Sequence, residues 1–241
     1  NIKSLVFDLR DNGGGLLKES VDIVNTFVSK DQTIVEQKGK VKEMNRLHKA
    51  QYAPVDTTMP IIVLINKNSA SASEIVSGSL QDLDRAAIVG QRSFGKGLVQ
   101  QTVQLSYGTQ MKVTTAKYYT PSGRCIQALD YFHKNTSGKA EHIPDSLIRE
   151  FKTKNGRSVY DGSGIFPDLK LEPKSYALIT GTIIGKNHVF DYATKYRLAH
   201  NSIAASKEFA LTEEEYKDFL QFLTDKTYTY TTKSEKSLDD L

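Results

Sequence analysis

Hydrophobic and polar positions follow two periods along the first half of the chain. Short apolar runs at residues 4–10, 61–65 and 86–90 have the length of strands, and the run at 61–65 is apolar throughout, which is typical of a buried strand. In residues 17–28 apolar positions recur every three or four residues, and in 74–80 the apolar positions 75, 76 and 80 lie on one helical face, so both segments predict helices. Two more strands are predicted at 33–37 and 110–119. Strands that alternate with helices favour an α/β fold.

The pattern changes after residue 130, where the chain becomes polar and rich in turn-forming residues. Residues 189–198 predict a helix, and Thr212 with Glu215 forms the S/T-x-x-E signature that opens another. We therefore predict two parts, an α/β core at residues 1–185 and a helical region at 186–241. The helices of the second part could pack on the core, mediate oligomerisation or complete an appendage.

Composition excludes several classes of protein. The 241 residues carry 32 basic and 28 acidic side chains, and the two signs alternate along the chain, which argues against nucleic acid as a partner. No apolar run approaches the roughly 18 residues of a membrane-spanning helix. Because the sequence begins with Asn1, we expect a piece of a longer protein from which any targeting signal has been removed.

Residues that bind metals are sparse. The five histidines do not form an H-E-x-x-H pair, and Cys125 is the single cysteine, so we predict no metal and no cofactor. No G-x-S-x-G turn occurs, so the sequence lacks the nucleophile turn of enzymes that carry that motif.

The segment from Gly90 to Lys96 matches a phosphate-binding loop, G-x-x-x-x-G-K. The next residue is Gly97, where such a loop needs Ser or Thr and the start of a helix. Residues 93–96 also match S-x-x-K, but the surrounding glycines disfavour the helical turn that this motif needs. Both interpretations are weak, and a nucleotide-dependent enzyme remains a minor alternative.

Two residues carry weak signals when each is taken alone. Lys96 lies between Gly95 and Gly97, where backbone freedom could aim its side chain inward, although most such lysines lie on the surface. Ser71 lies between the buried strand and a helix, where it could be either an exposed hydroxyl or simply the residue that caps the helix.

Five motifs in order resemble the carboxyl-terminal processing (tail-specific) proteases, the S41 family of serine peptidases, over about residues 3–172. They are D-L-R-D-N-G-G-G at 8–15, S-A-S-A-S-E at 69–74, F-G-K-G at 94–97 with Gln100, K-Y-Y-T-P-S-G-R at 117–124 and G-I-F-P-D at 164–168.

The resemblance implies a Ser/Lys dyad. Ser71 corresponds to the nucleophile, Lys96, 25 positions later, to the general base, and Gln100 to the residue that positions the lysine amine. Because an ammonium group cannot accept a proton, this chemistry requires Lys96 to be desolvated in the folded protein. The oxyanion hole would consist of the backbone N–H groups of Gly14 and Ala72.

Further expectations follow from the resemblance. Asp8 and Arg10 would position the glycine turn rather than transfer protons. The fold would be the crotonase/ClpP-like spiral of ββα units with a helical C-terminal extension. A PDZ domain would precede this chain, the substrates would be polypeptides recognised near their C-termini, and the location would be the periplasm or cell envelope. A non-catalytic peptide- or ligand-binding module on the same scaffold is the main alternative.

Overall fold

The computed structural model describes residues 2–173, 176–232, 235 and 237–238. The chain divides into two units, Asn1–Pro173 and Lys174–Leu241. The boundary that we predicted after residue 185 falls inside the second unit, at the end of helix α3 (Leu178–Gly185). The sequence pattern did not mark α3 as a helix because most of its residues are β-branched or glycine, which have low helix propensity.

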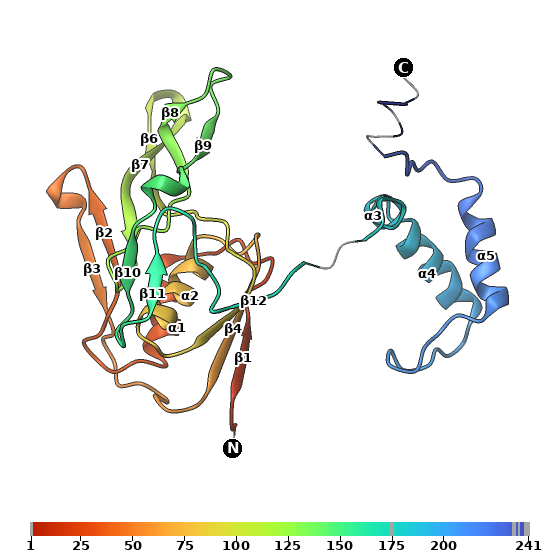
Figure 1. Ribbon diagram of the computed structural model, residues 1–241, viewed down its shortest axis with the longest axis horizontal. Coiled ribbons are helices and arrows are strands. Elements are labelled where there is room, and N and C mark those ends of the chain that lie inside the picture. Colours follow the sequence, from red (N-terminus) through yellow and green to blue (C-terminus); the bar gives the residue numbers. More distant parts are fainter. Residues whose placement is uncertain (1, 174–175, 233–234, 236, 239–241) are drawn as a thin grey trace. The chain divides into compact units, whose positions relative to one another are not determined.

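A parallel sheet forms one layer of the N-terminal unit (Figure 1). Its strands are, in spatial order, β1 (Leu5–Asp8), β4 (Ile61–Ile65), β5 (Ala87–Gly90) and β12 (Leu169–Lys170). Each pairs with its neighbour in parallel. The three strands predicted from the apolar runs are confirmed.

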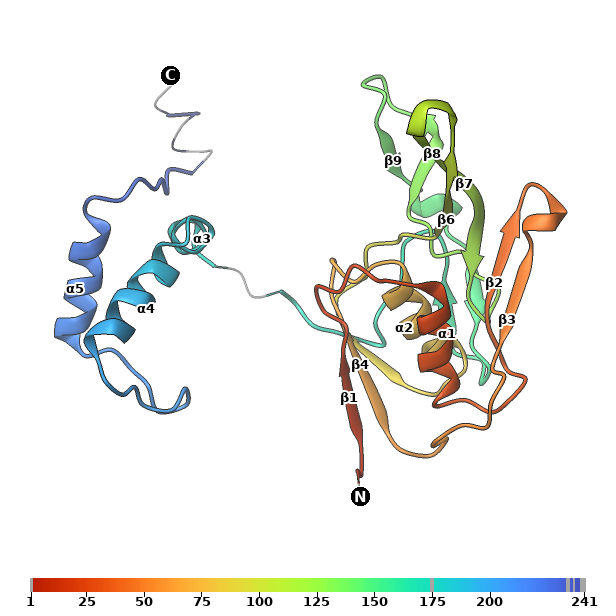
Figure 2. The same ribbon diagram turned by 180° about the vertical axis from the view of Figure 1, so that it is seen from behind.

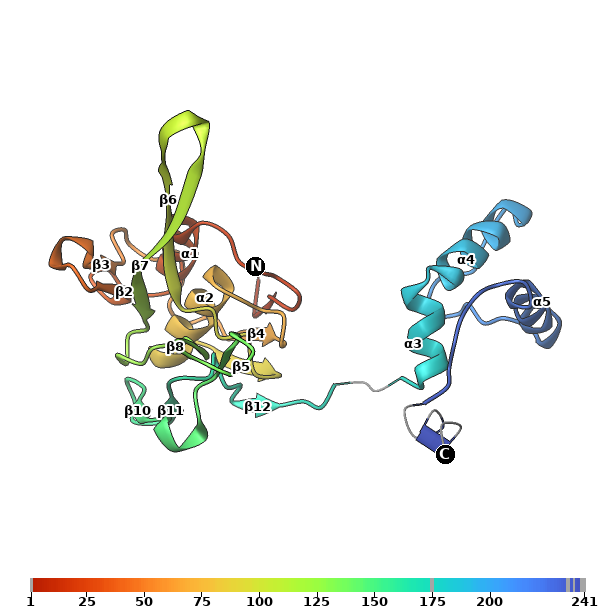
Figure 3. The same ribbon diagram turned by 90° about the horizontal axis from the view of Figure 1, so that it is seen from above.

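An antiparallel sheet forms a second layer, in the order β3 (Arg46–Lys49), β2 (Thr33–Gly39), β7 (Gln110–Tyr119) and β6 (Leu98–Gln104). The predicted strands at 33–37 and 110–119 are confirmed. Strand β6 was missed because it is mostly polar and exposed, and with β7 it forms a hairpin that projects from the unit (Figure 3). Two small antiparallel pairs complete the strands: β8 (Leu129–Lys134) with β9 (Ala140–His142), and β10 (Glu150–Lys152) with β11 (Ser158–Tyr160).

Helices α1 (Leu17–Asn25) and α2 (Ala72–Asp82), both predicted, lie side by side against the parallel sheet (Figures 1 and 2). Every residue of α2 is buried, and the hydroxyl of Ser79 donates to the carbonyl of Ile34 in β2 (2.7 Å), which links α2 to the antiparallel sheet. The apolar core joins both helices to both sheets. Its fully buried members include Val24, Ile34, Val63, Ile65, Leu80 and Ile88.

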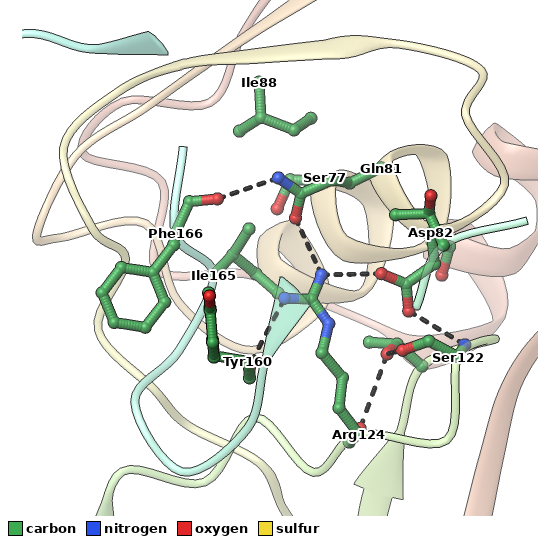
Figure 4. Close-up of polar contacts among 12 residues, drawn as sticks. Ser77, Gln81, Asp82, Ile88, Ser122, Arg124, Tyr160, Ile165 and Phe166 are labelled. Atoms are coloured by element: carbon green, nitrogen blue, oxygen red, sulfur yellow. Dashed lines mark hydrogen bonds and ion pairs between the residues drawn. The ribbon is translucent and has the colours of Figure 1, made fainter. Parts of the chain in front are cut away.

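A buried ion pair anchors the C-terminal end of α2 (Figure 4). Arg124 and Asp82 have fully buried side chains, and Arg124 Nη2 lies 2.8 Å from Asp82 Oδ1. The same nitrogen donates to Gln81 Oε1 (2.8 Å), and Asp82 Oδ2 accepts the N–H of Ser122 (3.0 Å). These contacts tie the segment around Arg124 to the end of the helix.

The C-terminal unit is helical, with α3, α4 (His188–Ala199) and α5 (Glu213–Leu223). The predicted capping signature is confirmed: Glu215 N–H donates to Thr212 Oγ1 (3.2 Å), and Thr212 N–H donates to Glu215 Oε2 (2.7 Å). Buried Tyr192 of α4 packs against Phe219 and Phe222 of α5, with ring centroids 4.9 and 5.5 Å apart. Among the described residues, no helix combines the length and hydropathy needed to cross a bilayer.

Candidate active site

Two loops meet at the carboxyl ends of β1 and β4, as expected for neighbouring parallel strands. The glycine loop follows β1 and the loop before Ser71 follows β4. The N–H of Ala70 donates to the carbonyl of Asn12 (3.0 Å), and the hydroxyl of Ser69 donates to the carbonyl of Leu9 (2.7 Å). The structure therefore brings the first two motifs together.

Polar side chains reinforce this contact. The side-chain amides of Asn68 and Asn66 donate to Asp11 Oδ1 (2.8 and 2.9 Å), and these bonds hold the pKa of Asp11 below its usual value. The guanidinium of Arg10 contacts both carboxylate oxygens of Asp8 and lowers the pKa of that carboxyl. Asp8 and Arg10 thus bond to each other at the start of the glycine loop.

Ser71 has a strained backbone immediately before α2. Its φ of 58° and ψ of −116° lie outside the regions that L-residues usually adopt, and such strain is concentrated at functional sites. Gly14 lies directly against it. A Cβ atom at Gly14, whose φ is +96°, would lie 2.8 Å from Ser71 Cβ and 2.6 Å from Ala70 O, so only glycine fits there.

The two predicted oxyanion donors differ in their hydrogen bonding. The N–H of Ala72, at the first residue of α2, has no acceptor among the residues that the structure describes, and the partial positive charge of the helix N-terminus favours an anion there. The N–H of Gly14 donates to Asn12 Oδ1 (2.9 Å). A ligand oxygen would meet one unoccupied donor and one that is engaged within its own loop.

Glu74 connects the nucleophile loop to the lysine loop. Its Oε2 accepts the N–H groups of Ser71 and Lys96, each at 2.8 Å, so those two nitrogens lie at most twice that distance apart. Its Oε1 accepts the N–H of Gly95 (2.6 Å) and the hydroxyl of Ser93 (2.5 Å). The backbones of the predicted nucleophile and base are therefore neighbours.

Burial raises the pKa of the Glu74 carboxyl above its ordinary value, whereas the hydrogen bonds from Ser93, Lys96, Gly95 and Ser71 oppose that rise. Each carboxylate oxygen accepts two of these bonds. The side chain is satisfied although no solvent reaches it.

Two expectations about side chains differ from the structure. Lys96 is exposed, so the described residues do not supply the desolvation that we expected. Gln100 is also exposed, and its amide donates to Thr114 Oγ1 (3.4 Å) across the β6–β7 pair rather than contacting Lys96. A register shift between Val99 and Gln100 interrupts the regular alternation of side chains along β6 at this position.

The phosphate-binding alternative is wrong on structural grounds. The chain after Gly97 forms strand β6, so no helix N-terminus is available to receive a phosphate, and residues 93–96 do not form the helical turn of an S-x-x-K site.

Sequence reasoning assigned no role to Glu74 or Ser93. The signal for Glu74 was present, because Ser71 and Glu74 have the S-x-x-E spacing in which the glutamate bonds back to the N–H at the start of a helix. The additional bonds to Gly95 and Lys96 depend on tertiary structure and have no local signature.

Comparisons with known proteins agree with the motifs. The family model "Peptidase family S41" matches residues 1–131, and the model "Probable PDZ-protease, C-terminal helical domain" matches residues 179–241. A "Carboxy-terminal-processing protease" of Bartonella bacilliformis is 45% identical over 128 residues, which are 53% of this chain and 29% of that protein. The chloroplastic "C-terminal processing peptidase" of Tetradesmus obliquus is 38% identical over 123 residues, 51% of this chain and 26% of that protein.

A solved structure, the photosystem II D1 C-terminal processing protease, aligns with 72% of this chain and 36% of its own, with a TM-score of 0.53 and 31% identity. The chain thus spans less than a third of the length of these two curated relatives. Since the family model covers more than half of the chain, the chain belongs to peptidase family S41, a family of serine peptidases.

Proposed function

We propose that this chain is the catalytic part of a serine endopeptidase in which Ser71 is the nucleophile and Lys96 the general base. One observation carries the proposal. The backbone N–H groups of Ser71, the strained residue before α2, and of Lys96, the predicted base, donate to the same carboxylate oxygen of Glu74. Acyl transfer by a dyad needs the side chains of nucleophile and base within hydrogen-bond reach, and the neighbouring backbones of Ser71 and Lys96 are compatible with that.

The chemistry takes two steps. In the first, Ser71 Oγ bonds to the carbonyl carbon of the substrate and its proton passes to the neutral amine of Lys96; the peptide C–N bond then breaks, and Lys96 returns the proton to the leaving amine. In the second, water attacks the acyl-enzyme and gives a proton to Lys96. The Ser71–acyl bond breaks, the serine oxygen takes the proton back, and the carboxylic product leaves.

The oxyanion of each tetrahedral intermediate would be bound by the N–H groups of Ala72 and Gly14. The Ala72 N–H is unoccupied and lies at a helix N-terminus, which supports this role. The Gly14 N–H becomes available when the substrate oxygen replaces Asn12 Oδ1 as its acceptor.

Desolvation of Lys96 would come from the bound polypeptide, because the lysine side chain is exposed in this structure. When substrate covers the site, removal of water disfavours the ammonium form and leaves the amine able to accept a proton. Gln100 would then turn from Thr114 and accept a hydrogen bond from that amine, without adding a negative charge that would hold the ammonium.

Several properties of the whole protein belong to the same proposal. The names of the relatives support polypeptide substrates that are recognised near their C-termini, and the second family model supports a PDZ domain elsewhere in the protein. A periplasmic or envelope location and a spiral arrangement of ββα units are proposed from the resemblance, whereas self-association is one of the roles left open for the C-terminal helices. The alternation of β1, α1, β2, β3, β4, α2 and β5 along the chain is compatible with such a spiral.

The proposal is tested by cleavage of an unfolded polypeptide with a metal chelator present and no nucleotide. Wild type should cleave, and Ser71→Ala and Lys96→Ala should not. The matched controls are Ser77→Ala, a buried serine on the same helix, and Lys67→Ala, an exposed lysine in the loop before it; both should cleave at nearly the wild-type rate. Cleavage that survives in Ser71→Ala would overturn the assignment. If neither wild type nor any variant cleaves, the assay is repeated with the whole protein; cleavage there would show a core that needs the PDZ domain, and continued failure with an extended peptide still bound would identify a binding module.

A further inference from the structure

Beyond the dyad, we propose that Glu74 is a positioning residue that fixes the separation of nucleophile and base by binding the backbones of both. This inference rests on the proposed function for its catalytic consequence. Its structural content, a carboxylate that joins two loops, can be tested on its own.

The geometry is that of a fully buried carboxylate that accepts four hydrogen bonds. Glu74 has no exposed surface, and it receives three backbone N–H groups and one hydroxyl at 2.5 to 2.8 Å. These donors come from two segments, residue 71 on one side and residues 93–96 on the other. The side chain therefore acts as a bridge between loops that follow different strands of the parallel sheet.

The hydroxyl of Ser93 donates to Glu74 Oε1 (2.5 Å), and its oxygen accepts the N–H of Ile165 (2.7 Å). Four donors directed at two oxygens suit an ionised carboxylate, because a protonated acid or an amide would turn a hydrogen towards one of these donors, three of which are N–H groups that cannot accept it.

A simple capping role explains only part of this arrangement. In a capping box the glutamate needs one bond, to the N–H at the start of its own helix, which here is that of Ser71. The bonds to Gly95 and Lys96 contribute nothing to the cap, since both residues lie beyond β5. These two bonds instead fix the position of the Lys96 backbone relative to Ser71.

The experiment compares Glu74→Gln with Asp82→Asn in the full chain. Both changes replace a fully buried carboxylate of α2 by an amide of nearly the same shape, one at the start of the helix and one at its end. Both should lower stability, and assays are run at a temperature where circular dichroism shows each variant folded. Ser93→Ala, which removes one donor and keeps the carboxylate, serves as a milder second variant.

Two measurements are made on each variant. In Glu74→Gln, the amides of Gly95 and Lys96 should lose protection from hydrogen exchange, and kcat should fall about 100-fold or more with KM changed only a few-fold, because a misplacement of about 1 Å is sufficient for such a loss. In Asp82→Asn, both amides should stay protected and kcat should remain within a few-fold of wild type. Ser93→Ala should lie between the two.

The outcomes separate the two proposals. Unchanged protection of Gly95 and Lys96 in Glu74→Gln overturns the bridge, whatever the activity. Lost protection with wild-type kcat, in an enzyme whose cleavage depends on Ser71, overturns the positioning role. If cleavage does not depend on Ser71 at all, the proposed function fails, while the exchange data still decide whether Glu74 joins the loops.

Discussion

The buried pair of Arg124 and Asp82 offers a sharp test of what holds the N-terminal unit together (Figure 4). Replacing Arg124 by Met removes the cation and leaves three acceptors without their donor: Asp82 Oδ1, Gln81 Oε1 and the carbonyl of Tyr160. Breaking a buried ion pair by removing one partner costs about 3 to 5 kcal/mol. Arg124 Nε has no partner among the described residues, so the guanidinium is incompletely hydrogen-bonded. We therefore expect Arg124→Met to lower the stability of the unit by about 3 to 4 kcal/mol, the lower part of that range.

The assay is native-state hydrogen exchange of the α2 amides, because the chain has two units and a global unfolding midpoint would combine them. Arg124→Met should lower the free energy of opening of these amides by about 3 to 4 kcal/mol. That loss corresponds to a change of roughly a hundred-fold or more in the opening equilibrium. Lys18→Met is the matched control. It removes the cation of an exposed pair with Asp22 on α1 and should cost less than about 1 kcal/mol.

A second variant separates the charge from the packing. In Arg124→Met combined with Asp82→Leu, no buried charge remains, and replacement of a buried pair by apolar residues is often neutral or stabilising. The double variant should therefore be more stable than Arg124→Met alone. A single-variant cost no larger than that of Lys18→Met, or a double variant less stable than the single one, would refute the reasoning.

Other predictions concern the glycine loop and the C-terminal unit. Gly14→Ala should abolish cleavage, because its Cβ would collide with the Ser71 loop, whereas Gly13→Ala, with nothing within 4 Å, should cleave as wild type does; equal rates would contradict the packing. Thr212→Ala should cost about 1 kcal/mol in the exchange-derived stability of α5, and an unchanged value would exclude the cap. Because the pKa of Asp11 is lowered in the folded state, its stabilisation is fully present above the ordinary value of 3.8 and is lost as pH falls through the folded value. The stability difference between wild type and Asp11→Ala should accordingly shrink as the pH falls, leaving only the pH-independent backbone cost of Ala at a φ of 59°, and a difference that does not change with pH would contradict this linkage.

Local patterns were sufficient to predict the core of the N-terminal unit. The apolar run at 61–65 became the buried strand β4, and the helical spacing at 74–80 became α2, because both patterns are determined by burial. The order of motifs also identified the family. Strand β6 and helix α3 escaped prediction since one is a polar exposed strand and the other is a helix built from β-branched residues.

The sequence predicts which residues form the candidate site, but not the contacts that they make. Ser71, Lys96, Gly14 and Ala72 could be assigned by resemblance, and the structure brings the loops that carry them together. The exposure of Lys96 and the bond between Gly14 and Asn12 depend on tertiary structure, which no local pattern encodes. The role of Glu74 depends on which loop meets the start of α2.

Helix α2 connects the candidate site to the buried ion pair of Arg124 and Asp82. Its sequence contains three serines and Gly78, which are poor helix formers, so the helix depends on tertiary contacts rather than on intrinsic propensity. Gly78 allows close approach of Ile165, since a Cβ there would lie 2.7 Å from Ile165 Cδ1. Glu74 fastens one end of the helix to the lysine loop, and Asp82 fastens the other to the segment around Arg124. The two carboxylates therefore have separate effects: Glu74 fixes the end of α2 that carries the strained serine, whereas Asp82 stabilises the opposite end without contacting the candidate site.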